Sequence, residues 1–201
     1  FALTGHFRAN FIYILEKLLG DNGTFSHQSQ AGDTVTLRPQ QNDGLAWLKG
    51  FLDGTDCNDA IFNLATATGK TLLILCVALS AFSSDRAQSV VLTFPSIDLV
   101  QQTQSALFGK FKALLDYFGV ETADVIGVCS DAGDITHNIT SVNALMDQTR
   151  TVQKGRVYLF CASSLGIMIS NAETAPTLEL LDTTRRTNAQ TLLNESKTFI
   201  F

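Results

Sequence analysis

Short apolar segments that alternate with helical segments constrain this chain more than any other feature of its sequence. Buried strands are predicted at Ala60–Leu64, Ser89–Phe94, Asp124–Cys129, Arg156–Cys161 and Lys197–Phe201. Helices are predicted at residues 7–19, 40–52, 70–82, 97–118, 141–148 and 164–171. Strands with near-continuous apolar character are typical of parallel sheets that are covered on both faces. The alternation therefore predicts an α/β fold, a parallel sheet with helices on both faces.

The first third of the chain shows a helix, a loop and a second helix. Residues 20–36 are polar and contain glycine, so they are predicted to be a loop. Pro39 suits the first position of a helix, and the periodicity after it turns four side chains inward. These four are Leu45, Leu48, Phe51 and Leu52. Further along, Thr177–Leu181 is compatible with either a helix or a strand.

Composition excludes several classes of protein. The chain has 201 residues, 45% of them apolar and 16% charged, which argues against disorder and against a coiled coil. Its net charge of -5 lacks the basic excess of many nucleic-acid-binding domains, although a few local contacts need no such excess. No apolar run reaches the roughly 18 residues of a membrane span. We expect no membrane partner and a cytoplasmic location, or a nuclear one in a eukaryote.

The cysteines and histidines indicate neither a disulfide framework nor a metal site. Cys57, Cys76, Cys129 and Cys161 are widely spaced and form no C-x-x-C motif. We expect them to be reduced thiols. The three histidines are far apart and have no partners at ligand spacing, which disfavours a metal site built from protein ligands alone. They are His6, His27 and His137.

The segment with the clearest chemistry lies between a predicted strand and a predicted helix. It reads Leu64, Ala65, Thr66, Ala67, Thr68, Gly69, Lys70, Thr71. In this context, backbone amides at the helix start enclose a phosphate, lysine reaches the β- and γ-phosphates, and the threonine hydroxyl binds Mg²⁺. The strict G-x-x-x-x-G-K-[ST] pattern has leucine at its first glycine here. The alternative interpretation is an ordinary turn before a helix.

This loop resembles the A-T-G-x-G-K-T loop of superfamily-two helicases and translocases. In that family an apolar residue commonly replaces the first glycine, and Ala67 stands here at the middle glycine. The resemblance implies an incomplete RecA-like P-loop NTPase domain that binds ATP and Mg²⁺. Lys70 and Thr71 would be its catalytic residues, with Thr71 also the Mg²⁺ ligand. It also implies nucleic acid as a partner, with DNA favoured over RNA, and a second RecA-like domain in the full-length protein.

The resemblance extends upstream of the loop. Leu37-Arg38-Pro39-Gln40-Gln41 is similar to the L-R-P-Y-Q segment of these motors, with glutamine in place of tyrosine. By this resemblance Gln41 would read the adenine edge, and Arg38 would lie near the base. Without it, the segment is a helix start with solvated glutamines. We expect residues 37–201 to be the partial ATP-binding domain and residues 1–36 an N-terminal extension of unknown role.

Two segments downstream resemble nucleic-acid-binding motifs of the same family. The first runs from Thr93 to Gln102 and is similar to V-P-S/T-x-x-L-V-x-Q, which would place Pro95, Ser96 and Gln102 on the nucleic-acid track. The second, Cys161–Leu165, is similar to T-Y-Q-S-L of helicases related to type III restriction enzymes, and Ser164 keeps its serine. Each serine also suits a helix cap, and a cap and a phosphate contact are compatible.

The D-E-x-H box of these motors is missing from the sequence. We expect it to follow Lys197–Phe201, so the chain is interpreted as a fragment that is inactive on its own. Asp182 is a rival for the metal-binding acid, but Thr183 follows it rather than an acid. The whole protein would be an ATP-dependent helicase or translocase. The alternatives are another P-loop NTPase and a non-catalytic nucleotide-binding or interaction module on the same scaffold.

Overall fold

A parallel sheet of five strands organises the structure, in the order β5-β4-β6-β3-β7. The computed structural model describes residues 5–20, 25–28, 32, 34–54, 69–83, 89–129, 138–139, 141–147, 156–173, 180–192 and 198–200. All four neighbouring pairs of strands are parallel. The strands are β3 (Ser89–Phe94), β4 (Val125–Val128), β5 (Asn138–Ile139), β6 (Arg156–Cys161) and β7 (Thr198–Ile200). The predicted parallel α/β architecture is confirmed.

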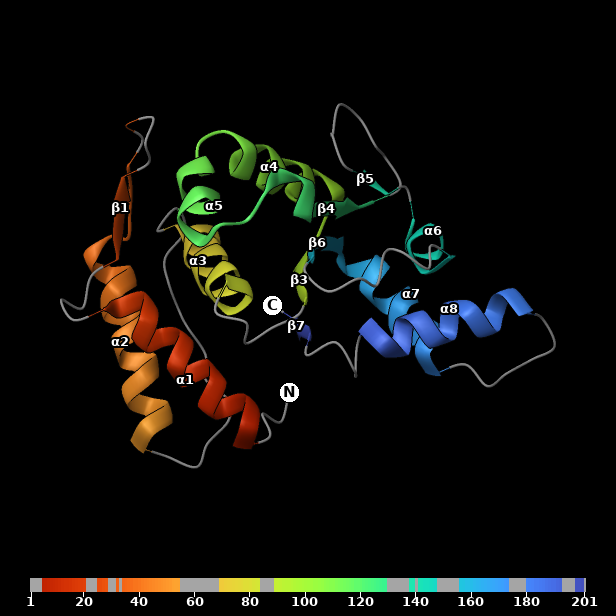
Figure 1. The fold of residues 1–201 in the computed structure, drawn as a ribbon, viewed down its shortest axis with the longest axis horizontal. Coiled ribbons are helices and arrows are strands. Elements are labelled where there is room, and N and C mark those ends of the chain that lie inside the picture. The colour runs from red at the N-terminus through yellow and green to blue at the C-terminus, as the bar shows by residue number, and fades with distance from the viewer. Residues whose placement is uncertain are drawn as a thin grey trace.

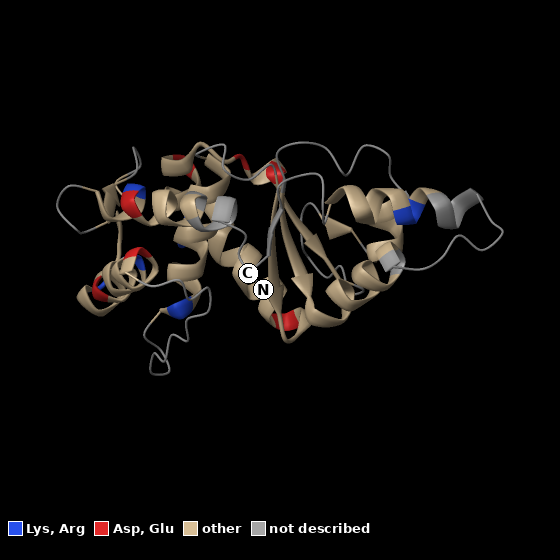
Figure 2. Cartoon of the chain, turned by 90° about the horizontal axis from the view of Figure 1, so that it is seen from below, with Lys and Arg blue, Asp and Glu red and all other residues tan. Residues whose placement is uncertain are grey.

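Helices cover both faces of the sheet, as Figures 1 and 2 show. Along β6, Val157 and Leu159 belong to one buried cluster, while Tyr158 and Phe160 belong to the other. Alternate side chains of one strand therefore fill two separate cores. The first core is closed by α3 (Lys70–Ser83), α4 (Ile97–Phe108) and α5 (Lys112–Phe118), and the second by α6 (Val142–Asp147), α7 (Ala162–Glu173) and α8 (Leu180–Gln190).

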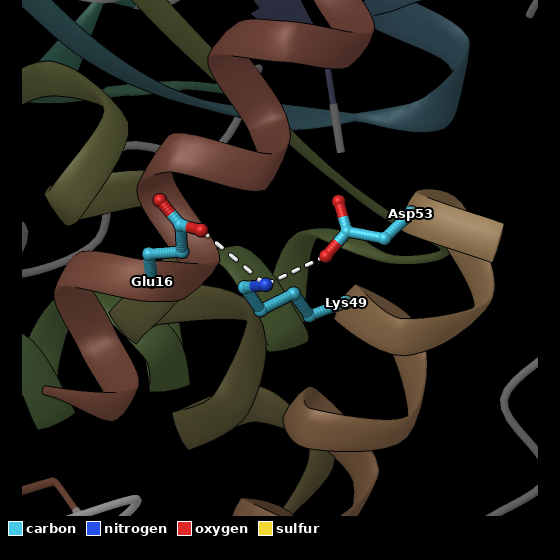
Figure 3. A network of polar contacts seen from close by, with 3 residues as sticks. All are labelled: Glu16, Lys49 and Asp53. Carbon is cyan, nitrogen blue, oxygen red and sulfur yellow. Dashed lines mark hydrogen bonds and ion pairs between the residues drawn. The ribbon is translucent and has the colours of Figure 1, made fainter. Parts of the chain in front are cut away.

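Two further helices, α1 (Gly5–Leu19) and α2 (Pro39–Gly54), pack against each other, and α1 also packs on α3. Leu45 and Leu52 are buried as predicted, and the partly buried Leu48 and Phe51 pack on the same core. At the surface, Lys49 Nζ on α2 lies 2.6 Å from Asp53 Oδ2 and 3.3 Å from Glu16 Oε1 of α1 (Figure 3). The carboxylates of Asp53 and Glu16 raise the pKa of Lys49.

The helix predicted at 97–118 is two helices, because Gly109 ends α4. The amide of Gly109 donates to Ser105 O at 3.0 Å, and its ψ of -99° leaves the helical region. A Cβ on Gly109 would lie 3.2 Å from Ser105 O, a tight contact. After a turn, α5 begins at Lys112 and packs its apolar side into the first core.

The predicted loop at 20–36 contains a small antiparallel hairpin of β1 (Ser26–Gln28) and β2 (Thr34–Thr36). Phe25 precedes it and packs edge-on to Tyr117 of α5, with ring centroids 5.1 Å apart. The hairpin is thereby fixed to the layer that contains α5.

Other predicted elements also have clear outcomes. The helices predicted at 141–148 and 164–171 correspond to α6 and α7, and the ambiguous segment at 177–181 ends in the first residues of α8. The strand predicted at Ala60–Leu64 lies outside the described residues.

Candidate nucleotide-binding site

The start of α3 carries the part of the predicted phosphate loop that the structure describes. Gly69 has a φ of +83°, a backbone conformation that glycine adopts far more readily than other residues. Lys70 and Thr71 follow in the first turn, with both side chains exposed. The first amides of a helix lack intrahelical acceptors, so they are available to an anion. The Lys70 ammonium, the Thr71 hydroxyl and these amides are groups of the kind that bind a phosphate and its metal ion.

Gln41 connects this turn to the start of α2. Its Nε2 donates to Gly69 O at 2.8 Å, and its Oε1 accepts from the Arg38 amide at 2.7 Å. The Gln41 side chain is buried, with 1% of its surface exposed. A Cβ on Gly69 would lie 2.5 Å from Gln41 Nε2, so only glycine allows this approach. The structure thus brings together two predicted site residues that are far apart in the sequence.

Asn42 holds the same helix start from the other side. Its Nδ2 donates to Leu37 O at 3.2 Å, and its Oδ1 accepts from the Phe25 amide at 3.3 Å. Asn42 is also buried, and it ties the hairpin to the segment that precedes α2. Sequence reasoning missed this positioning residue. Its signal is a second polar residue beside Gln41 in a turn that faces the core.

The remaining predicted nucleotide ligands have different outcomes. The Arg38 side chain is exposed, and its backbone positions Gln41. Outside the described residues lie Leu64, Ala65, Thr66, Ala67 and Thr68.

The start of α3 lies toward the carboxyl end of β3. α3 ends at Ser83, β3 begins at Ser89, and the two elements are in contact, so they run in opposite directions. A helix of 14 residues extends about 21 Å. Its first turn is therefore far from the amino end of β3. Ligands of open parallel sheets bind outside the carboxyl ends of the strands, which is the edge that α3 approaches.

The two segments predicted to bind nucleic acid follow neighbouring strands at this same edge of the sheet. β3 and β6 are neighbours in which Phe94 pairs with Cys161, so Pro95 and Ala162 follow adjacent strand ends. Ser96 caps α4, with its Oγ accepting from the Leu99 amide at 3.4 Å. The predicted cap is confirmed, while the phosphate contact stays a prediction.

Two further predicted contacts lie on the helices that follow. Ser164 is in the first turn of α7 and is half-buried, and Gln102 is exposed on α4. Their role on a nucleic-acid track also stays a prediction.

Asp182 lies within α8, on the sheet face opposite to α3. A metal-binding acid of the expected kind follows a strand, and Asp182 does not.

The described residues contain no group of three or more His, Cys, Asp or Glu that could hold a metal ion. Cys76, Cys129 and Cys161 are buried and form no disulfide among the described residues, and Cys57 lies outside the described part. In that part no helix has the length and apolar character needed to cross a membrane.

The parallel sheet and the two helical layers that cover it are those of a RecA-like α/β domain. A sequence model of the type III restriction enzyme res subunit family matches residues 26–200, and the chain belongs to this family. Members of the family are helicase-like ATP-binding modules. The match begins within β1, ahead of the boundary predicted at residue 37. No curated protein and no solved structure matches the chain.

Proposed function

We propose that this chain is the nucleotide-binding part of an ATP-dependent motor that moves on nucleic acid, with DNA favoured. The observation that carries the proposal is the hydrogen bond from Gln41 to Gly69. It joins the segment that resembles the adenine-reading motif to the segment that resembles the phosphate loop. A generic turn before a helix has no need of a buried glutamine from another helix, so this contact favours the motor over the ordinary-turn interpretation.

The residues at the start of α3 would hold the nucleotide's phosphates. The Lys70 ammonium would bind the β- and γ-phosphates, and the Thr71 hydroxyl would orient toward the metal ion. The glycine at position 69 brings the backbone close to the ligand, with Gln41 holding its carbonyl in place. When bound, Mg²⁺ neutralises charge on the phosphates.

The edge formed by the ends of β3 and β6 would hold the nucleic acid. Pro95, Ser96, Gln102 and Ser164 would line its backbone, and the hydroxyls of Ser96 and Ser164 and the helix-start amides suit phosphate oxygens. Such contacts are few and independent of sequence, which is compatible with a net charge of -5. A second RecA-like domain in the same protein would supply the opposite wall of the nucleotide site.

Nucleotide binding tests the proposal directly. The readout is the affinity for a fluorescent ATP analogue in the presence of Mg²⁺. Turnover is a poor measure, because the D-E-x-H box is not among the 201 residues. We expect Lys70→Ala to abolish binding and Asp182→Ala to leave it unchanged. Equal affinities of the two variants for the analogue would contradict a role for the start of α3 in nucleotide binding.

A second experiment separates the motor from a different nucleotide-binding module. Competition with ATP, GTP and CTP measures base selectivity, and Gln41→Ala should reduce the preference for adenine. Ser164→Ala should weaken binding to single- or double-stranded DNA and leave nucleotide affinity intact. Nucleotide binding without base preference and without any DNA or RNA binding would favour another P-loop protein instead.

A further inference from the structure

Two thiols lie at the carboxyl ends of neighbouring strands, Cys161 as the last residue of β6 and Cys129 directly after β4. β4 and β6 pair in parallel, with Val125 opposite Val157 and Val128 opposite Phe160. Continued by one residue, this register places Cys129 opposite Cys161. The backbone of Cys129 still follows the sheet there, since its amide donates to Ile139 O of β5 at 3.1 Å.

Both thiols point to the same face of the sheet. Cys129 and Cys161 belong to the first buried cluster, whereas Val128 and Phe160, which precede them, belong to the second. Neighbouring strands are about 4.8 Å apart, within the range of Cα separations that a disulfide spans. Cβ atoms in a disulfide are slightly closer than this. Closure therefore requires a small approach, at a place where β4 has already ended.

Two amide side chains lie close to the end of β4, near Cys129. Its Sγ donates to Asn138 Oδ1 at 3.7 Å, while Asn138 Nδ2 is buried with no partner in the described part of the chain. Gln104 of α4, 1% exposed, lies over Gly127, two residues before Cys129, and its Oε1 has no partner among the described residues. The Cys129 thiol therefore borders a polar side chain as well as the apolar first core.

We propose that Cys129 and Cys161 form a redox-active pair, which a hydroperoxide converts into an intramolecular disulfide. Cys161 is the more exposed, at 9% against 1% for Cys129, so it meets the oxidant first. Its sulfur attacks one peroxide oxygen, which gives a sulfenic acid and releases the other oxygen as water or an alcohol. The Cys129 sulfur then attacks the Cys161 sulfur, the S–S bond forms, and the hydroxyl leaves as water with the remaining proton.

The disulfide would restrain the segment that follows β6. α7 begins at Ala162, directly after Cys161, and Ser163 Oγ now donates to Cys161 Sγ at 3.4 Å. Oxidation would link this turn to the end of β4. The chemistry of these two thiols is independent of whether Ser164 contacts nucleic acid.

Cys76 provides an internal control. It is fully buried in α3, and burial raises the pKa of its thiol to about 12. A thiol with so little thiolate at neutral pH reacts slowly with oxidants and alkylating agents.

Peptide mapping of the full 201-residue chain tests the pair. Trypsin places the four cysteines on four separate peptides, 50–70, 71–86, 113–150 and 157–185. The folded chain is treated with graded hydrogen peroxide, alkylated and digested. We expect peptides 113–150 and 157–185 to be linked as the main disulfide product, and a reductant to release them. A Cys57→Ala variant should retain the link, and Cys129→Ala and Cys161→Ala should each abolish it.

A second measurement needs no variant. Phenylarsine oxide bridges two adjacent thiols, and the folded wild-type chain should bind one equivalent that a dithiol removes and a monothiol does not. Protection of peptides 113–150 and 157–185 from alkylation would identify the bound thiols. Main products that link peptide 50–70, or chains joined to one another, would overturn the proposal. So would a failure of the arsenical to protect both cysteines.

Discussion

Replacement of Gly69 by alanine tests the contact on which the nucleotide site is built. The new Cβ would lie 2.5 Å from Gln41 Nε2, and the backbone would keep a φ of +83°. The amide of Gln41 is the end of a side chain, so it can move away. Since it is buried and bonded to the Gly69 carbonyl and the Arg38 amide, that movement breaks two hydrogen bonds.

The expected loss of stability has two parts. A left-handed conformation costs a non-glycine residue about 1–2 kcal/mol. A buried amide that loses its partners costs about 1–3 kcal/mol more. Gly69→Ala should therefore lower the free energy of unfolding by about 2–5 kcal/mol, a large part of the roughly 5–15 kcal/mol of a typical domain.

Gly119→Ala is the matched control. Gly119 has a φ of +64°, and an added Cβ would meet nothing within 4 Å. Only the conformational part, about 1–2 kcal/mol, applies there. Urea unfolding followed by the fluorescence of Trp47, the single tryptophan, gives both values from the shift of the midpoint at constant slope.

A double-mutant cycle isolates the Gln41 contact. In a Gln41→Ala background, Gly69→Ala should cost only about 1–2 kcal/mol, because no amide is left to displace. Equal losses for Gly69→Ala and Gly119→Ala would refute the reasoning. An unchanged effect of Gly69→Ala in the Gln41→Ala background would refute it as well.

Three further perturbations test other parts of the structure. Ser96→Ala removes the cap of α4 and should lower the unfolding free energy by about 0.5–1 kcal/mol in urea, with Ser96→Gly closer to wild type. Leu114→Ala, at a fully buried position of α5, should cost about 2–5 kcal/mol in the same assay. Asp53 and Glu16 raise the pKa of Lys49 above its ordinary 10.5, so their stabilisation is complete below pH 10.5 and is lost as the pH rises through the raised value. The melting temperatures of wild type and Lys49→Met should therefore differ at neutral pH and converge in alkaline solution; a constant difference would contradict this.

The sheet could be predicted because its strands are apolar on both faces. A strand such as Val90–Leu92 is buried from both sides, so its composition alone distinguishes it from a loop. The hairpin lacks this signal. Its strands have three residues each, and in β2 only Val35 is buried between two exposed threonines. The break at Gly109 was also hidden, because apolar residues continue on both sides of it.

The candidate site was predictable in its parts and not in its assembly. The Gly69-Lys70-Thr71 turn has a local pattern, whereas the contact between Gln41 and Gly69 crosses 28 positions of the sequence. Asn42 gives only a weak signal, as a second polar residue beside Gln41, because its bonds are to backbone groups whose positions only the fold determines. The juxtaposition of Cys129 and Cys161 depends on strand register, which spacing along a chain does not reveal.

The pairing of β7 with β3 determines when the sheet can be completed during synthesis and folding. β7 pairs with β3, so Ser89 meets Thr198 only after residues 90–197 have been synthesised. Until then one side of β3 presents unpaired backbone groups on an apolar strand, which is a template for association with other chains. Closure of so long a loop is slow, since pairing far along the sequence is entropically unfavourable. A strand of three residues thus sets the interval during which the nascent sheet is most exposed to aggregation.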